Sequence, residues 1–377
     1  MRKILFTSES VGQGHPDKIC DQISDSILDA FLEQDKNSHV AIETMATGNY
    51  LIIAGEVNSK AKVNCQQIAI NVLKKAGQFS DQLKIVQDIK IQSPDINQGV
   101  SRSEGPTGAG DQGIMFGFAT NETKEYMPLP ITLANALIKE ADKRRLSGEL
   151  KWSKSDMKAQ VSIDYSDKKH IVVDTVLMSI QHEEDYDDII YKQNIKNLII
   201  DVLKKYNLEE PRTILINPTG RFVIGGPIGD TGLTGRKIIV DTYGGFARHG
   251  GGAFSGKDPS KVDRSAAYAL RWIAKNLVAA NVADKIELQV SYAIGVSEPV
   301  SIYVETFDTN KYPHVEIVKC IQDLFNLTPD GIISELKLKE TKYAPTSYYG
   351  HFGRDDLDLP WERLNKVEDI KNFFKNK

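Results

Sequence analysis

The chain has 377 residues, enough for two or three domains with buried cores, so a mini-protein or a lone small binding module is excluded. Apolar residues make up 41% and charged residues 26%, which excludes long disorder, collagen-like repeats and a coiled coil. With 47 Lys and Arg against 51 Asp and Glu, the net charge is -4, which disfavours a cationic nucleic-acid coat unless basic residues cluster locally.

The cysteine content indicates the compartment. Cys20, Cys65 and Cys320 are too far apart for a CxxC pair, which argues against a disulfide framework or a zinc ribbon and fits a reducing cytoplasm. The start of the chain has too few consecutive apolar residues for a signal peptide, and no run approaches the roughly 18 residues of a membrane span. We therefore expect a cytoplasmic protein without membrane or nucleic-acid partners.

The first third of the chain predicts a helix, a hairpin and a second helix. Pro16, followed by an acidic residue and apolar residues on one face, predicts a helix start. Two β-rich runs, His39–Thr47 and Tyr50–Val57, are joined by Gly-Asn and predict a hairpin. A helix is then expected over Ala61–Lys75.

A polar segment follows at Gln92–Gly113. It has no apolar period and is rich in Gly, Ser and Pro, which predicts a long loop. Long loops are often functional. We expect Gln98–Ala109 to form a mobile lid that orders over bound substrates.

The strand and helix pattern then recurs twice. A strand pair is predicted over Val161–Tyr165 and His170–Ile180, followed by a helix over Ile195–Tyr206. The third round has a strand near Ile238, a strand over Glu287–Ile294 and a long helix over Asp263–Ala280. Three such rounds suggest three α+β units of comparable size.

Glycine is concentrated between residues 220 and 256, where 12 of the 28 glycines lie within 37 residues. An average content of about 7% would give roughly three, so this segment predicts tight turns or close approach to a ligand. From Arg221 to Arg264, seven cations accompany four acids, a local +3. This pattern is typical of a polyphosphate site, although a structural turn region with a solvated basic face remains an alternative.

Two familiar nucleotide motifs are excluded. Gly251–Lys257 fits GxxxxGK, but Asp258 occupies the position where a P-loop needs Ser or Thr. Gly108–Gly113 fits GxGxxG, but a polar loop precedes it instead of a strand.

The segment Gly12–Lys18 places an imidazole, a carboxylate and a cation at a predicted helix N-terminus, which attracts phosphate. His15 could stabilise charge on a leaving oxygen and Asp17 could bind Mg²⁺. The alternative is an ordinary helix start, in which Asp17 is a first-turn acid and His15 has no function.

Eight runs spread over almost the whole chain carry a family pattern: Phe6–Val11 (FTSESV), Gly14–Lys18 (GHPDK), Ser93–Gly99 (SPDINQG), Gly108–Gly113 (GAGDQG), Ile216–Gly226 (INPTGRFVIGG), Gly229–Asp230, Gly250–Arg264 (GGGAFSGKDPSKVDR) and Tyr349–Arg354 (YGHFGR). In these runs the chain resembles the S-adenosylmethionine synthetases, also called methionine adenosyltransferases. The resemblance implies an α+β fold of three similar units with mixed or antiparallel sheets in a pseudo-threefold arrangement. We expect the units to span residues 1–99, 107–225 and 226–365.

The resemblance also implies a two-step reaction. Methionine sulfur attacks C5′ of ATP and expels tripolyphosphate, which the same site hydrolyses to pyrophosphate and phosphate. Sulfur is a good nucleophile without a general base, so orientation and cations should provide the catalysis.

Site residues follow from the resemblance position by position. The expected catalytic residues are His15, Lys158, Arg236, Lys237, Lys257 and Lys261. ATP would also contact Asp156, Arg221, Phe222, Asp230 and Ala253. Methionine would contact Glu56, Gln98, Asp111, Asp230 and Lys261. Asp17 and Asp263 would bind two Mg²⁺ ions per site, and Glu43 would bind K⁺.

The resemblance further implies a homo-oligomer, a dimer of dimers, with His15 and Asp17 of one subunit facing Lys257, Lys261 and Asp263 of another. Gln13, the short segment Gln78–Ile91 and the lid sequence depart from the family pattern, which bears on affinity and product inhibition. A non-catalytic paralogue is the alternative function, but the expected catalytic groups are all present. A nucleic-acid or oligosaccharide module would need more aromatic platforms among the cations.

Overall fold

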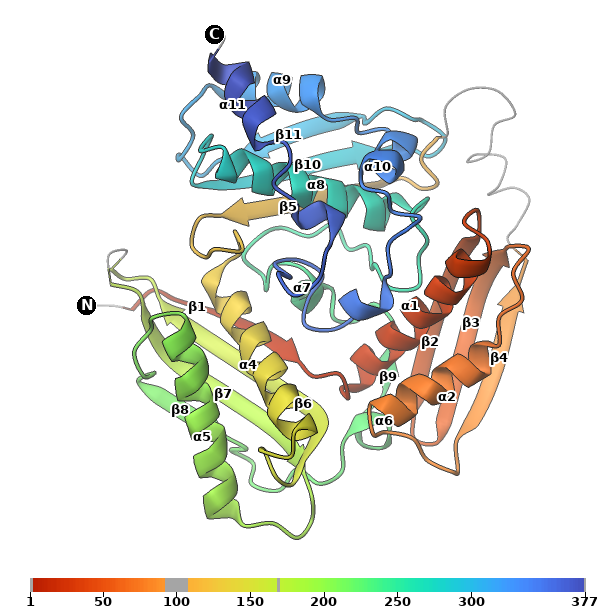
Figure 1. Cartoon of the computed structure of the whole chain (residues 1–377), viewed down its shortest axis with the longest axis vertical. Helices are drawn as coiled ribbons and strands as arrows, with labels where there is room; N and C mark the ends of the chain where they lie inside the picture. The colour runs from red at the N-terminus through yellow and green to blue at the C-terminus, as the bar shows by residue number, and fades with distance from the viewer. Residues whose placement is uncertain (1–2, 92–107, 168–169, 376–377) are drawn as a thin grey trace.

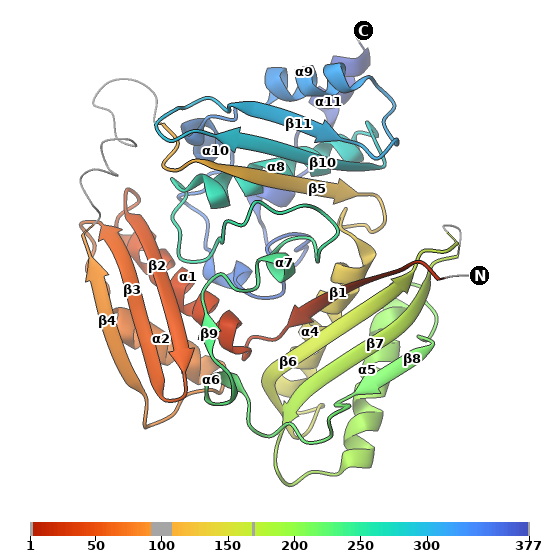
Figure 2. The ribbon, with the colours of Figure 1, turned by 180° about the vertical axis from the view of Figure 1, so that it is seen from behind.

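The computed structural model describes residues 3–91, 108–167 and 170–375, and within them three β-sheets with their helices form a triangular molecule (Figure 1). The expected α+β class with three sheet-and-helix units is confirmed. Figure 2 shows all three sheets from the face that their long helices leave bare.

The first sheet has the strand order β4-β3-β2-β9. Its strands are β2 (His39–Thr47), β3 (Tyr50–Asn58), β4 (Lys84–Lys90) and β9 (Gly232–Leu233). The pair β2 and β3 forms the predicted antiparallel hairpin, whereas β4 joins β3 in parallel. Helices α1 (Pro16–Gln34) and α2 (Cys65–Lys75) lie on one face.

The second sheet has the order β1-β6-β7-β8. Its strands are β1 (Leu5–Val11), β6 (Ser153–Asp164), β7 (Val172–His182) and β8 (Thr213–Ile216), with β8 parallel to β7 and the other pairs antiparallel. Helices α4 (Leu129–Leu146) and α5 (Asp188–Lys205) cover one face.

The third sheet has the order β11-β10-β5 and is antiparallel. Its strands are β5 (Gly113–Thr120), β10 (Lys285–Tyr292) and β11 (Ser301–Glu305). The long helix α8 (Val262–Ala279) packs on β5 and β10, and α9 (His314–Leu324) packs on β11.

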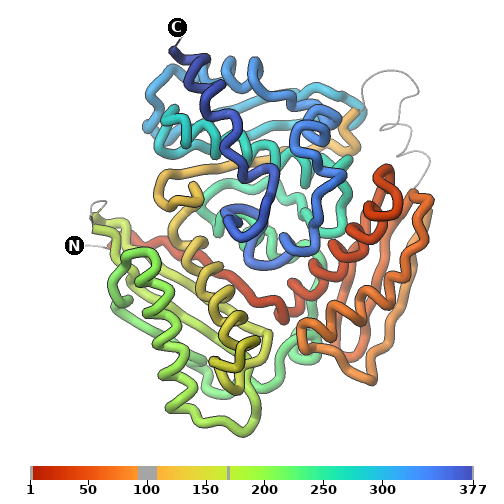
Figure 3. The backbone as a smooth tube through the Cα atoms, in the orientation of Figure 1, coloured from red at the N-terminus to blue at the C-terminus, as the bar shows by residue number. Residues whose placement is uncertain are grey.

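Short elements complete the fold. They are α6 (Gly226–Gly229), α7 (Ile238–Asp241), α10 (Pro329–Glu335), α11 (Val367–Lys375) and the 3₁₀ turns η1 (Ala344–Thr346) and η2 (Pro360–Glu362). Figure 3 shows the blue C-terminal part of the chain returning to the centre of the molecule, where η1 packs beside α1.

Each sheet takes a strand from a distant part of the sequence. β1 belongs to the second sheet, β9 to the first and β5 to the third. One apolar core joins α1 and the first sheet to α8 and the third sheet, whereas α4, α5 and the second sheet share a separate core. The unit boundaries at 1–99, 107–225 and 226–365 stay a prediction.

Some predicted elements differ from the structure. The strand expected near Ile238 is wrong, because residues 238–241 form α7, closed by the Asp241 N–H donating to the Lys237 carbonyl at 2.9 Å. The helix expected from Ala61 begins at Cys65, where the Asn64 side chain accepts from the Gln67 N–H at 3.0 Å. The third-unit strand and helix shift by one or two residues.

Two elements of the central unit are longer than predicted, and three, namely α4, β5 and β8, were missed. The helix expected from Ile195 starts at Asp188, because the Asp187 side chain caps it. β6 begins at Ser153, eight residues before the predicted strand, and α4 was not predicted at all. The expected lid lies almost entirely outside the described residues. Among the described residues, no helix is long and apolar enough to cross a membrane.

Candidate active site

The turn that leads into α1 lies directly against β6. The Gly12 N–H donates to the Met157 carbonyl at 2.8 Å, and the Gly14 N–H donates to the Ser155 carbonyl at 3.1 Å. A Cβ at Gly14 would lie 2.0 Å from Ser155 Oγ, so glycine allows the close approach. This turn fixes His15 at the start of α1 with only 2% of its surface exposed.

A hydrogen bond decides the tautomer of His15. Its Nδ1 accepts from the Asp17 N–H at 3.2 Å, which leaves the proton of the neutral ring on Nε2. Burial lowers the pKa of His15 to about 3, helped by the charges of Lys237, Lys158 and Lys18 and opposed by Asp17. His15 is therefore neutral near pH 7 and carries an Nε2–H donor.

Asp17 connects α1 to the loop that follows β9. Its Oδ1 accepts from the Leu233 N–H at 2.9 Å, and its Oδ2 lies 2.5 Å from Lys237 Nζ. The Arg236 guanidinium lies 3.8 Å from Oδ1. Although burial opposes it, the Lys237 hydrogen bond and the Leu233 N–H lower the pKa of Asp17. The fold thus assembles an inner group, defined as His15, Asp17, Lys158, Arg236 and Lys237.

Asp156 lies beside the inner group on β6. Its Oδ2 accepts from the Gly226 N–H at 2.8 Å, while its buried Oδ1 has no hydrogen-bond partner among the described residues. Burial raises the pKa of Asp156 to about 6, and nearby Asp230 adds to this, against Lys158. Asp156 therefore keeps a spare acceptor next to the cations.

An outer group, defined as Lys257, Lys261 and Asp263, lies before and at the start of α8. Lys257 Nζ lies 2.6 Å from Asp263 Oδ2, and Lys261 pairs with Asp258. Asp258, at the position where a P-loop has Ser or Thr, also accepts from the Val40 N–H at 2.7 Å and so has a structural role. The side chains of Lys257 and Asp263 are 26% and 23% exposed.

Within the described part of one chain, no hydrogen bond or ion pair joins the inner group to the outer group. Their loops do approach each other at Gly235, where a Cβ would lie 2.5 Å from Ala253 Cβ. Ala253 therefore lies where the two loops meet. A single chain brings both sets of cations into one region without combining them.

The predicted nucleotide residues Arg221 and Phe222 lie in the loop after β8, beside the end of β7. Arg221 pairs with Glu184 at 2.5 Å, with both side chains largely exposed, and the Phe222 N–H donates to His182 Nε2 at 3.0 Å. Asp230 is exposed after α6. These residues lie on the polypeptide that leads into the inner group.

Two further residues predicted to bind methionine or potassium lie on the strands of the first sheet, where the Ile42 N–H of β2 donates to the Gly256 carbonyl at 3.0 Å. Glu43 and Glu56 are on the paired strands β2 and β3, where Glu43 is opposite Ala54 and Glu56 is opposite Ala41. Asp111 is exposed just before β5. Gln98 lies outside the described residues.

Among the described residues, no three His, Cys, Asp or Glu side chains lie close enough to hold a metal ion. Asp17 and Asp263 are instead single carboxylates, each beside a lysine. Mg²⁺ commonly takes one or two protein carboxylates together with substrate phosphates and waters. The donor set therefore fits Mg²⁺ held mainly by a polyphosphate, but not a protein cage.

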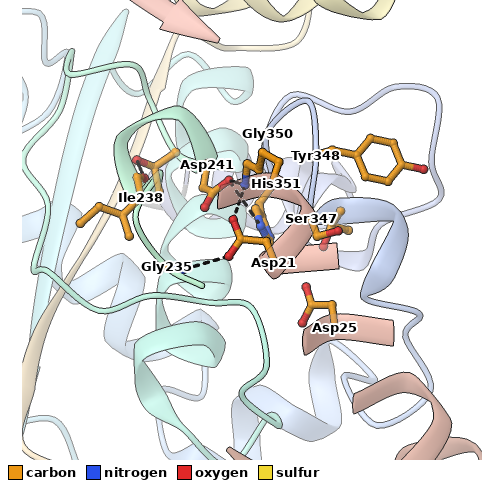
Figure 4. Close-up of polar contacts among 12 residues, drawn as sticks. Asp21, Asp25, Gly235, Ile238, Asp241, Ser347, Tyr348, Gly350 and His351 are labelled. Carbon is orange, nitrogen blue, oxygen red and sulfur yellow. Dashed lines mark hydrogen bonds and ion pairs between the residues drawn. The ribbon is translucent and has the colours of Figure 1, made fainter. Parts of the chain in front are cut away.

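Sequence analysis missed a buried polar network beneath the inner group: Lys18, Asp21, Asp25, Asp241, Arg264 and His351. Figure 4 shows Asp21, Asp25, Asp241 and His351 converging from α1, α7 and the C-terminal loop. Burial raises the pKa of Asp241 to about 7 against the charge of Lys18, with which it pairs. The recurrence of Asp at every fourth position from Asp17 was an available signal, because an amphipathic helix would bury that row with its partners.

Comparison with known proteins gives matches along the whole chain. The family models are those of the N-terminal domain of S-adenosylmethionine synthetase over residues 3–95, the central domain over residues 106–222 and the C-terminal domain over residues 224–363. The S-adenosylmethionine synthase of Mycoplasmopsis synoviae is 57% identical over 373 residues, covering 98% of both proteins. That of Mycoplasmopsis pulmonis is 56% identical over the full length of both, and that of Helicobacter pylori strain J99 is 52% identical over 98% of both.

Proposed function

Since the chain belongs to the S-adenosylmethionine synthetase family and is a methionine adenosyltransferase that makes S-adenosylmethionine from ATP and methionine, we propose how its residues carry out this reaction. Methionine sulfur attacks C5′ of ATP, and the C5′–O bond breaks to release the whole tripolyphosphate. A second step hydrolyses tripolyphosphate to pyrophosphate and phosphate. The observation that carries this proposal is the buried, neutral His15 beside the cations of the inner group.

His15 acts at the oxygen that leaves C5′. Its Nε2–H is a hydrogen-bond donor, and Lys158 and Lys237 lie near enough to lower its pKa. Negative charge grows on that oxygen as the bond breaks, and a donor already in place stabilises it without reorganisation.

The remaining cations bind the polyphosphate. Lys158, Arg236 and Lys237 of the inner group act together with Lys257 and Lys261 of the outer group. In support, Arg236 and Lys237 already lie 3.8 and 2.5 Å from the carboxylate of Asp17, and carboxylate oxygens resemble those of a polyphosphate. Binding of the anion exchanges one set of charge-assisted hydrogen bonds for another.

Asp17 and Asp263 hold Mg²⁺ in this proposal, two ions per site, and Glu43 holds K⁺. When bound, Mg²⁺ supplies further neutralisation of the triphosphate charge. Asp17 remains ionised at pH 7, because its pKa is lowered by Lys237 and Leu233 although burial opposes this. Each carboxylate is available once its lysine turns to the phosphate.

Adenosine and methionine take the remaining predicted residues. Arg221, Phe222, Ala253 and Asp156 contact the nucleotide, and the spare buried acceptor of Asp156 supports this. Methionine binds at Glu56, Gln98, Asp111 and Asp230, with Lys261 reaching its carboxylate. A carboxylate can pair with the methionine ammonium.

We also propose a homo-oligomer, a dimer of dimers, whose active sites lie between subunits. The separation of the inner and outer groups within one chain supports this, as does the bare face of each sheet with exposed residues such as Ile114 and Tyr303. We place the enzyme in the cytoplasm, supported by its low cysteine content, with three cysteines in 377 residues, all of them buried.

The test is incubation with ATP, methionine, Mg²⁺ and K⁺. We expect S-adenosylmethionine together with equal amounts of pyrophosphate and phosphate, all dependent on methionine. Omission of methionine is the control. ADP as the main product would overturn the proposal, because cleavage at C5′ leaves the triphosphate whole.

A further inference from the structure

Four aspartates recur at every fourth position of α1: Asp17, Asp21, Asp25 and Asp29. This spacing places them on one face of the helix. The face is turned inward, since Asp21 and Asp25 have no exposed surface and Asp29 has 9%. A buried carboxylate is costly unless it is hydrogen-bonded or paired. Each of the four therefore needs partners from the elements packed on α1.

The partners are backbone N–H groups of loops. Asp21 Oδ1 accepts from the Gly235 N–H at 2.9 Å, drawn as a dashed line in Figure 4. Asp25 Oδ1, one turn further along α1, accepts from the Gly256 N–H at 2.9 Å. Gly235 immediately precedes Arg236 and Lys237, and Gly256 immediately precedes Lys257. Adjacent turns of one helix thus hold the loops of both cation groups.

These loops need external support because their glycines adopt backbone conformations that few residues share. Gly235 and Gly256 have φ of +79° and +81°. A Cβ at Gly256 would lie 1.9 Å from the Ile42 carbonyl oxygen, so the loop packs tightly against β2. A free glycine-rich loop would lose much entropy on adopting this form.

The charges of the two aspartates are balanced inside the protein. Asp21 Oδ2 lies 2.9 Å from Lys18 Nζ. Asp25 accepts hydrogen bonds from Nη1 and Nη2 of Arg264, at 2.7 and 2.8 Å, and Nη1 also donates to the Lys257 carbonyl at 3.1 Å. Asp25 and Arg264 therefore bind the Gly256 N–H and the Lys257 carbonyl of the same loop. Because these carboxylates pair with Lys18 and Arg264, they do not occupy the cations of the inner and outer groups.

We propose that Asp21 and Asp25, the latter with Arg264, are positioning residues that hold each of the two cationic loops in place on α1, so that the lysines of each loop are preorganised to bind polyphosphate. This inference rests on the proposed function of those lysines. It assigns the aspartates no contact with substrate. The aspartates act on affinity, because a loop that is already held in place loses less entropy when its cations bind the anion.

The experiment measures the Kd of tripolyphosphate by titration calorimetry, together with thermal stability and the fraction of folded sites. Asp21→Ala removes the acceptor for Gly235 and leaves Lys18 paired with Asp241. We expect the Kd per folded site to rise on the order of tenfold. Asp21→Asn keeps an oxygen acceptor and should restore most of the affinity.

The second arm is the double variant Asp25→Ala with Arg264→Met, which removes the buried pair together and avoids an unpaired charge. It should also raise the Kd on the order of tenfold, and it tests the proposal by itself if Asp21→Ala does not fold.

Asp29→Ala is the matched control. Asp29 accepts from the N–H groups of Tyr343 and Ala344, at 2.8 and 2.9 Å, in a segment without the predicted site cations. It should lower stability and leave the Kd per folded site unchanged.

Lys237→Ala separates this inference from the proposed function. If Lys237→Ala weakens binding but both positioning variants bind like wild type, or like Asp29→Ala, the inference alone is overturned. If Lys237→Ala also binds tripolyphosphate like wild type, the proposed phosphate role and the inference fall together. Weaker binding in Lys237→Ala and in the folded positioning variants, with rescue by Asp21→Asn, supports both.

Discussion

The inner and outer groups carry the same kinds of side chain but are held in different ways. In the inner group, Asp17 binds Leu233 and Lys237, more than 200 residues away in sequence, with a side chain that is 3% exposed. In the outer group, Lys257 pairs with Asp263 only six residues away, and about a quarter of each side chain is exposed. Both groups are cationic, but only the inner one is built on almost fully buried side chains, those of His15 and Asp17, while its Arg236 is 52% exposed.

The difference indicates that the two groups have different roles in the reaction. Buried long-range contacts preorganise the inner group, which suits stabilisation of charge at one reacting bond. Local and partly exposed pairs leave the outer lysines free to follow an extended anion. The following predictions test this contrast, beginning with the largest expected effect.

Replacing His15 by Ala should separate the two chemical steps. The variant loses the Nε2–H donor at the breaking bond, so formation of S-adenosylmethionine should slow on the order of a hundredfold or more. Hydrolysis of added tripolyphosphate should fall far less, because His15 acts at C5′ and not along the chain. Single-turnover assays of each step measure this, with Lys261→Ala as the comparison from the outer group. Equal losses of both steps in His15→Ala would contradict the assigned role.

Mixing two inactive variants tests whether the groups combine between subunits. His15→Ala and Lys261→Ala chains, unfolded and refolded together in equal amounts, should give mixed dimers as half of the dimers. Each mixed dimer then has one doubly defective site and one intact site, so activity should return to about a quarter of wild type. Mass spectrometry of the mixture confirms exchange. No recovery despite proven exchange would show that both residues act from the same chain.

The fold class and the inner group were largely predictable from the sequence. Pro16 with a following acid marked the start of α1, and the paired runs at residues 39–57 marked the hairpin, because these signals are local. His15 and Asp17 were found from the motif at the helix start and from the family resemblance.

Other features depend on contacts that local patterns do not contain. The β-branched run at Ile238 predicts a strand by propensity. Instead the Asp241 N–H donates to the Lys237 carbonyl, and the segment forms the short helix α7. The buried pair of Asp25 and Arg264 joins residues far apart in sequence. The exchange of β1, β5 and β9 among sheets is likewise a property of the whole fold.

The titration of His15 should make the stability of the inner group depend on pH. Its pKa is about 3 in the folded state, through burial and Lys237, against about 6.5 in an unfolded chain. Below pH 6.5 the unfolded chain takes up the proton first, so the free energy of unfolding should decrease as pH falls, by roughly 1.4 kcal/mol per pH unit from this group. Above pH 6.5 its contribution is complete.

Urea unfolding from pH 7.5 to 4.5 measures this dependence, with His15→Gln as a reference that cannot titrate. The difference between wild type and His15→Gln isolates His15 from the other buried acids. A difference that stays constant over this range would show that His15 has an ordinary pKa in the folded protein.

The smallest effect is expected from two matched lysine substitutions, Lys237→Met in the inner group and Lys257→Met in the outer group. Both keep an aliphatic stem and remove one positive charge. Lys237→Met leaves the buried Asp17 carboxylate with the Leu233 N–H and the more distant Arg236, so unfolding should become easier by about 1 to 3 kcal/mol. Lys257→Met breaks a partly exposed pair, whose loss costs about 0 to 1 kcal/mol. Urea unfolding at pH 7.5 compares the free energies of unfolding of the two variants.

Removing Lys237 also removes a charge that lowers the pKa of His15, so the free energy of unfolding of Lys237→Met should decrease less on acidification than that of wild type. If both variants lower the free energy of unfolding equally and leave its pH dependence unchanged, the contacts of the inner group stabilise the fold no more than those of the outer group.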